Sequence, residues 1–307
     1  MDNFEGGVAV VTGAASGLGR GMAERFAREG MTAVIADNRI DDASSVADAI
    51  VAGGARAVAI EVDVTDRGSV IALADRVDEL GGATVLVNNA GVLSHTPIGE
   101  PVEDGWRWIV DVNLFGVVYG VQTFLPRMLT SGRPGHIVNT ASLAGVVGGG
   151  GLQQNRITVG DGSPDLGSMY GYMATKHSVV AVSETLARDL SGSPIGVSVL
   201  CPSHHQNTFI NENSAEFRPE QAGGPMDDAE RLATFGRMDA QRDEQYKVKR
   251  KERFPEECAA RVVEAIRTGQ FYVFTHPETR LAVEHRFRQI LAGFDDSAAF
   301  DDSAFPH

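Results

Sequence analysis

The chain has 307 residues, 43% of them hydrophobic, and a formal net charge of −14 at pH 7. This acidic balance excludes nucleic-acid binding as the expected function, because no basic stripe offsets it. Nothing in the sequence resembles a signal peptide or an 18-residue apolar span, and it has only two cysteines, so we expect a cytoplasmic protein with unpaired thiols and no membrane partner.

Short apolar runs alternate with segments of helical periodicity along the chain, and no Pro/Ser linker divides it. Strands are predicted at 8–12, 32–37, 57–62, 84–88, 135–140, 195–200 and 271–274. Helices are predicted at 17–29, 42–53, 67–80, 102–130, 169–191 and 255–268. Such alternation predicts a doubly wound parallel sheet in three α/β/α layers, in a single domain over residues 1–307.

The first strand leads directly into a glycine-rich turn that reads Thr-Gly-Ala-Ala-Ser-Gly-Leu-Gly over residues 12–19. Leu18, Met22 and Phe26 then recur at i+4 spacing, which predicts a helix. A glycine turn between a strand and a helix lets the backbone approach a pyrophosphate at the helix N-terminus. We therefore predict a phosphate site there, the alternative being an ordinary glycine-rich turn.

A tyrosine and a lysine one helical turn apart, Tyr172 and Lys176, form the second informative pattern. Bringing a tyrosine pKa from about 10 to about 7 requires roughly 4 kcal/mol of preferential phenolate stabilisation. An ammonium about 4 Å away supplies roughly that much at an effective dielectric constant near 20. The pair is a candidate acid–base device, although an isolated pair of this kind is more often a solvated helix face.

Six motifs in order resemble the short-chain dehydrogenase/reductase family over about residues 5–205. They are the glycine turn, Asp63-Val64, Asn88-Asn89-Ala90-Gly91, Asn113, the strand that ends at Ser142, and Tyr172 with Lys176. The resemblance implies a Rossmann fold that binds a nicotinamide dinucleotide.

The resemblance also implies the roles of individual residues. Ser142, Tyr172, Lys176 and Asn113 are the expected catalytic set, in which Asn113 would hold a water through a distortion of its helix. The alternative for Asn113 is an amide that satisfies the core. The expected cofactor-binding set is Gly13, Ser16, Gly17, Leu18, Gly19, Asp37, Asp63, Val64, Asn89, Ala90, Gly91, Tyr172, Lys176, Pro202 and Thr208. Asn89 could equally steady the central strand.

Asp37 at the end of the second predicted strand favours NAD over NADP. A carboxylate at this place accepts hydrogen bonds from the ribose hydroxyls and repels a 2′-phosphate. Arg39 is the one residue nearby that could reach such a phosphate.

Three departures from the family pattern concern the substrate side. An inserted segment, 148–168, separates Ser142 from Tyr172, and serves as a substrate lid, a partner contact or a tolerated loop. The loop after Pro202 lacks the usual glycine, so either Asn207 or Thr208 could meet the nicotinamide. Its His204-His205 pair has no third ligand placed by spacing, so no metal site is predicted. We expect the charged region 203–253 to be a substrate loop and lid.

The C-terminal part has a further helix near 278–293 and weakly resembles a bacterial branch that includes lignin-derived benzylic alcohol dehydrogenases. Residues 294–307 are predicted to be a disordered acidic tail. The resemblance thus implies an NAD-dependent dehydrogenase for a bulky or aromatic secondary alcohol or ketone, in a homodimer or homotetramer. Alternatives are an NADPH-dependent carbonyl or 3-oxoacyl reductase and a non-catalytic dinucleotide-binding sensor.

Overall fold

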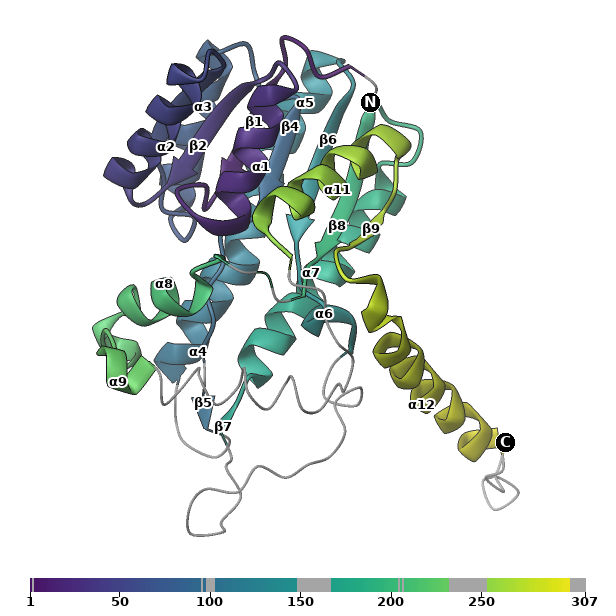
Figure 1. Cartoon of the computed structure of the whole chain (residues 1–307). Coiled ribbons are helices and arrows are strands. Elements are labelled where there is room, and N and C mark those ends of the chain that lie inside the picture. The colour runs from purple at the N-terminus through teal and green to yellow at the C-terminus, as the bar shows by residue number, and fades with distance from the viewer. Residues whose placement is uncertain are drawn as a thin grey trace.

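A parallel sheet forms the centre of the protein in a computed structural model, which describes residues 1, 3–94, 96–97, 103–147, 167–203, 205, 207–231 and 253–298. Within these residues the sheet has seven strands in the order β3-β2-β1-β4-β6-β8-β9 (Figure 1). The strands are β1 (Val8–Thr12), β2 (Thr32–Asp37), β3 (Arg56–Glu61), β4 (Val85–Asn88), β6 (Gly135–Thr140), β8 (Ile195–Cys201) and β9 (Tyr272–Phe274). All seven predicted strands are confirmed to within one residue at each end.

Helices cover both faces of the sheet, which confirms the doubly wound α/β class. They are α1 (Gly17–Arg28), α2 (Ile40–Ala52), α3 (Arg67–Glu79), α4 (Glu103–Val110), α5 (Gly116–Ser131), α6 (Ala144–Val147), α7 (Tyr170–Asp189), α8 (Ile210–Glu216), α9 (Asp228–Arg231), α11 (Pro255–Thr268) and α12 (Arg280–Ala298). Short 3-10 segments lie at Glu220–Ala222 and Pro277–Thr279, and β5 (Thr96–Pro97) pairs with β7 (Gly167–Ser168) in a small antiparallel ribbon.

The layers follow from alternation along fully buried strands. In β1, Ala9 and Val11 belong to the core under α1, α2 and α11. Val8 and Val10 belong to the opposite core, under α3 and α5. Because successive side chains of a strand point to opposite faces, a continuous apolar run is what a sheet covered on both sides requires.

The sheet changes direction between β1 and β4. From β1 the chain builds outward through β2 and β3, returns to β4 on the other side of β1, and continues outward to β9. Ligands of such sheets bind beyond the carboxyl ends of the strands at this switch point. Gly13 follows β1 and Asn89 follows β4, so both lie at this point.

The helical stretch Asp104–Ser131 contains an 18-residue window with a mean hydropathy of 1.4, and by length and composition alone it could cross a membrane. The expectation that the sequence holds no 18-residue apolar span was therefore wrong. Core helices meet the same criterion, and α5 buries Phe124 and Met128 against the sheet. Only 33% of that window is buried, so this packing covers part of the apolar stretch.

The three segments expected to depart from the core are described in part. Residues 148–166 of the insert lie outside the described residues, and 167–168 form β7. The segment 203–253, for which a substrate loop and lid are predicted, contains α8 and α9, while residues 232–252 lie outside the described part. Helix α12 extends to Ala298. Residues 294–298, which the sequence predicted to be disordered, are therefore helical. Both cysteines are buried and unpaired.

Candidate active site

The glycine turn is shaped by backbone contacts that leave no room for side chains. A Cβ on Gly19 would lie 2.1 Å from the carbonyl oxygen of Gly13. Gly17 has a φ of +55°, and a Cβ there would lie 2.5 Å from the carbonyl oxygen of Thr208. Ser16 precedes α1 without capping it, and Leu18 packs on the core. The turn at the N-terminus of α1 therefore carries no side chains at its glycines, which lets an anion approach the backbone N–H groups.

Thr12 and Asn89 join the switch-point strands. The Thr12 hydroxyl accepts hydrogen bonds from the backbone N–H groups of Asn89 and Ala90, at 3.0 and 3.1 Å. The Asn89 side chain donates to the Thr12 carbonyl at 3.0 Å and accepts from the Thr140 hydroxyl at 3.4 Å. Asn89 thus links the strands β1, β4 and β6, which is one of its two predicted roles. Ala90, which follows it, lies against Gly13.

Asp37 lies buried at the end of β2 and faces the glycine turn. One carboxylate oxygen accepts a hydrogen bond from the Ala15 backbone at 2.9 Å, and the other accepts from the Arg39 backbone at 3.0 Å. The Arg39 guanidinium lies 3.5 Å from Asp37 and 3.2 Å from Asp42, and donates to the Ser16 hydroxyl at 2.9 Å. Two carboxylates therefore surround this cation.

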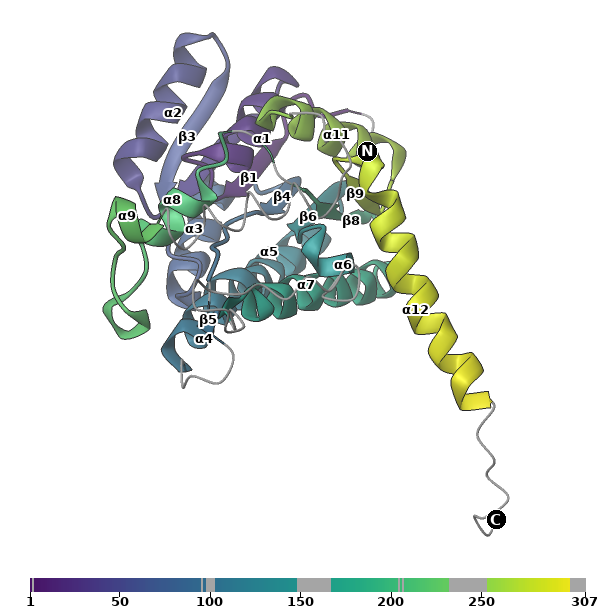
Figure 2. The same cartoon turned by 60° about the horizontal axis from the view of Figure 1, so that its bottom comes forward.

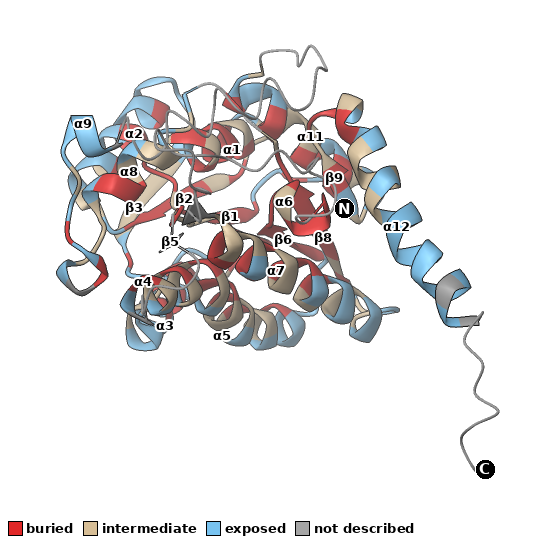
Figure 3. Cartoon of the chain, turned by 90° about the horizontal axis from the view of Figure 1, so that it is seen from below, coloured by how far each residue is buried: buried red, intermediate tan, exposed pale blue. Residues whose placement is uncertain are grey.

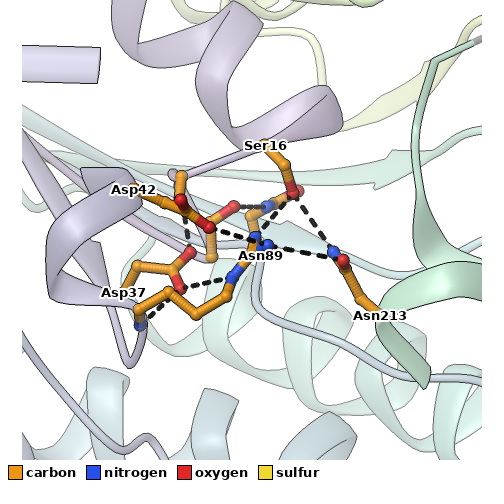
Figure 4. A network of polar contacts seen from close by, with 8 residues as sticks. Ser16, Asp37, Asp42, Asn89 and Asn213 are labelled. Atoms are coloured by element: carbon orange, nitrogen blue, oxygen red, sulfur yellow. Dashed lines mark hydrogen bonds and ion pairs between the residues drawn. The ribbon is translucent and has the colours of Figure 1, made fainter. Parts of the chain in front are cut away.

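The hydrogen bonds around Arg39 and Ser16 extend to α8, in the segment predicted to be a lid. Asn213 on α8 donates to the Ser16 hydroxyl at 3.2 Å, and its side-chain oxygen lies 3.5 Å from the Arg39 guanidinium (Figure 4). The ring of Phe217 lies 5.6 Å from that guanidinium. Helix α8 is thereby fastened to the glycine turn.

Asp63 and Val64 follow β3 at the same edge of the sheet. Asp63 is exposed, and one of its oxygens accepts hydrogen bonds from the backbone and hydroxyl of Thr65, at 2.9 and 2.7 Å. Val64 is buried against Gly116, where a Cβ would lie 3.0 Å from it. Both residues follow the carboxyl end of β3.

Asn113 sits in a π-helical turn, Asp111–Phe115, between α4 and α5. Its side chain accepts a hydrogen bond from Val92 N–H at 2.8 Å and donates to the Val92 carbonyl at 2.9 Å. This is the bonding of a core-satisfying amide, and the π turn is the helix distortion that the resemblance implied. A Cβ on Gly91 would lie 3.2 Å from the Asn113 oxygen and 3.4 Å from the Lys176 Nζ, so these three residues are neighbours.

Lys176 lies beside Tyr172 and beside the end of the strand that leads to Ser142, despite the 148–168 insert. Lys176 Nζ donates to the Thr140 carbonyl at 2.9 Å, two residues before Ser142, and lies 5.6 Å from the centre of the Tyr172 ring. Lys176 is only 3% exposed, and burial lowers its pKa to about 8. The Ser142 hydroxyl accepts from Ala144 N–H at 3.1 Å. The ring of Tyr170 lies instead against Trp106.

The loop after β8 carries two residues in the left-handed region, Asn207 at φ +57° and Phe209 at φ +54°. Such strain in residues other than glycine clusters at functional sites. Thr208 lies between them, and its carbonyl oxygen packs on Gly17 of the glycine turn. The carbonyl of the buried Pro202 accepts a hydrogen bond from Leu143 N–H at 2.8 Å. His205 packs its ring edge-to-face on His276, and the described residues contain no group of three metal ligands.

Three contributors to this site had no strong signal in the sequence. Thr12 was seen only as part of the glycine motif, although its hydroxyl joins two strands. Asn213 and Phe217 lie in a charged stretch without periodicity, so their contacts with Arg39 depend on the tertiary fold. A search for polar or aromatic residues in the first helix after β8 is the one pattern that would have found them.

Comparisons with known proteins agree with this geometry. Residues 7–154 match the short chain dehydrogenase family. A C alpha-dehydrogenase of Sphingobium sp. is 32% identical, over 95% of this chain and 87% of that protein. A 1-deoxy-11-beta-hydroxypentalenate dehydrogenase of Streptomyces exfoliatus is 33% identical, over 92% and 87%. The crystal structure of a short chain dehydrogenase/reductase from Burkholderia phymatum in complex with NAD has a TM-score of 0.79 and 35% identity, covering 95% of this chain and 97% of that one.

Proposed function

Since the chain belongs to the short-chain dehydrogenase/reductase family and is an enzyme acting on CH–OH groups, we propose that it is an NAD-dependent dehydrogenase for an apolar, bulky or aromatic secondary alcohol. The observation that carries the proposal is the place of the buried Lys176 ammonium, which lies 5.6 Å from the Tyr172 ring centre and bonds the end of the strand that leads to Ser142. The same residues would also reduce the corresponding ketone.

The glycine turn fits a dinucleotide. A Cβ on Gly13 would lie 2.8 Å from Ala90 Cα, so both backbones are kept bare where a pyrophosphate would approach. Gly13, Ser16, Gly17, Leu18 and Gly19 would hold the pyrophosphate. Asp37 would hold the adenosine ribose, and Asp63 with Val64 would hold the adenine. The nicotinamide half would be held by Asn89, Ala90, Gly91, Tyr172, Lys176, Pro202 and Thr208. When bound, the nicotinamide ring supplies the hydride acceptor.

The proton in this reaction is handled by the protein. Tyr172, as phenolate, removes the hydroxyl proton of the substrate. The Lys176 ammonium, held by the Thr140 carbonyl, favours the ionised form of Tyr172 by its positive charge. The Ser142 hydroxyl donates a hydrogen bond to the substrate oxygen and keeps it within reach of the tyrosine.

The preference for NAD is supported by the charges around the ribose position. Asp37 and Asp42 outnumber Arg39, so this cluster carries a net negative charge that repels a 2′-phosphate. The guanidinium is also engaged by Ser16, which leaves fewer donors for such a phosphate. The alternative, an NADPH-dependent reductase, needs Arg39 to leave these partners.

An apolar substrate is supported by the side chains packed around Tyr172. Leu93, Ile109 and Ala215 form a buried cluster with it, and Met169, Ile210 and Met226 pack against that cluster. These apolar surroundings of Tyr172 favour an aromatic or aliphatic group next to the reacting hydroxyl.

The direct test is the absorbance of reduced nicotinamide, with NAD and NADP each offered with aliphatic, steroidal and aryl secondary alcohols. We expect turnover with NAD and an aryl alcohol. Reduction of ketones with NADPH alone would contradict the proposal in favour of the carbonyl reductase. NAD binding without turnover in either direction would favour the sensor.

Replacing Asp37 by alanine is expected to lower the ratio of kcat/KM for NAD over NADP at least about 10-fold, because the carboxylate that repels a 2′-phosphate is lost. Steady-state kinetics with both cofactors measure this ratio. Asp41→Ala is the matched control, since it removes an exposed carboxylate from the same turn. An unchanged ratio in Asp37→Ala would show that another residue selects the cofactor.

A further inference from the structure

Helix α12 leaves the body of the protein as an arm. Its first turns are held by Ala282 and Val283, which pack on the core, and by Arg286, which donates to the Val146 carbonyl at 2.6 Å. From Phe287 to Ser297, every residue whose side chain is described is exposed. Figures 2 and 3 show this part of α12 pointing away from all other elements. We call residues 287–298 the arm.

One face of the arm is apolar. The exposed fractions are 51% for Phe287, 45% for Ile290, 61% for Leu291 and 70% for Phe294. Their i, i+3, i+4, i+7 spacing places them on one side of the helix. They continue the face on which Val283, four residues before Phe287, packs on the body. We call these four residues the apolar stripe.

No described side chain from Phe287 to Ser297 is buried, so packing within the described part of the chain does not stabilise the arm. Isolated helices shorter than roughly 12–15 residues are marginal in water, and an interior glycine, here Gly293, costs about 1 kcal/mol more. Four large apolar side chains on one helical face are characteristic of helices that are packed against another element. A partner therefore accounts for both the apolar stripe and the helical state of the arm.

We propose that this partner is a second copy of the chain, whose arm packs antiparallel on the first about a two-fold axis between Ile290 and Leu291. In this arrangement Phe287 meets Phe294 of the second copy, and Ile290 meets its Leu291. A two-fold contact of this kind uses the same patch twice and closes on itself.

The charges of the arm support the antiparallel direction. Arg288 precedes the middle of the apolar stripe and Asp295 follows it. Antiparallel pairing brings each arginine near the aspartate of the second copy, whereas a parallel two-fold pair would place these charged flanks on opposite sides of the contact. A membrane surface is a poorer occupant, because amphipathic helices that bind anionic lipid carry an excess of lysine and arginine.

The test is the mass of the full-length chain in solution, measured by light scattering and sedimentation over a range of concentrations. Leu291→Glu is expected to halve the mass, or to raise the dissociation constant of the assembly on the order of 100-fold. Gln289→Glu is the matched control, since it adds the same charge on the opposite face of the arm and should keep the wild-type mass.

The charge pairing is tested separately. Arg288→Asp is expected to weaken the assembly about 10-fold, and the double variant Arg288→Asp/Asp295→Arg to restore it. A monomeric wild type, or a Leu291→Glu variant with the wild-type mass, would overturn the proposal, as would a double variant no better than the single one. NAD affinity should stay unchanged in all variants, so this test is independent of the proposed enzymatic function.

Discussion

Replacing Tyr172 by phenylalanine is expected to lower kcat at least about 1,000-fold, while the dissociation constant for NAD changes less than about two-fold. General acid–base catalysis contributes roughly 10²–10⁴-fold, and this substitution removes only the hydroxyl that takes the proton. The ring stays in the cluster with Leu93 and Ile109, so the fold should not change. Single-turnover kinetics and calorimetric titration with NAD measure the two quantities.

Tyr170→Phe is the matched control for this substitution. It removes the same atom from the same helix, two residues away, where the ring packs on Trp106. Activity of this variant should remain within about two-fold of the wild type. A fully active Tyr172→Phe variant, or an equal loss in both variants, would disprove the assignment of Tyr172 as the base.

The centre of the sheet was predictable because β1, β4 and β6 are buried along their whole length. The runs at 8–12, 32–37 and 135–140 are short and rich in apolar residues, and the structure has the same limits. The ribbon of β5 and β7 was not predictable, since two-residue strands carry no periodicity. The length of α12 was underestimated because its last turn is rich in aspartate, which is typical of loops as well as of helix ends.

The site was predictable where motif residues follow strands in sequence. Gly13, Asp37, Asn89 and Ser142 each come directly after a strand or end one, so a parallel sheet gathers them at one edge. The link from Arg39 to Asn213 spans 174 residues, and it depends on how the loop after β8 folds back over the glycine turn. Such tertiary contacts leave no local pattern in the sequence.

Replacing Lys176 by methionine is expected to stabilise the protein while removing most of its activity. Burial lowers the lysine pKa from 10.5 to about 8, so the charged form costs about 3 kcal/mol of stability at neutral pH. The Thr140 carbonyl loses its donor in the variant, which offsets roughly 1–2 kcal/mol. The expected net gain is about 1–2 kcal/mol at pH 7, measured by urea unfolding without cofactor.

The pH dependence separates this effect from better packing. Because the folded-state pKa lies below the unfolded one, unfolding of the wild type takes up a proton between about pH 8 and 10.5, and its stability rises with pH in that range. The methionine variant lacks this rise, so its advantage should disappear near pH 10.5. Its kcat should fall at least about 100-fold at pH 7, since the ammonium that favours ionised Tyr172 is gone. A variant that is active, or whose advantage persists at high pH, would contradict this role for the buried charge.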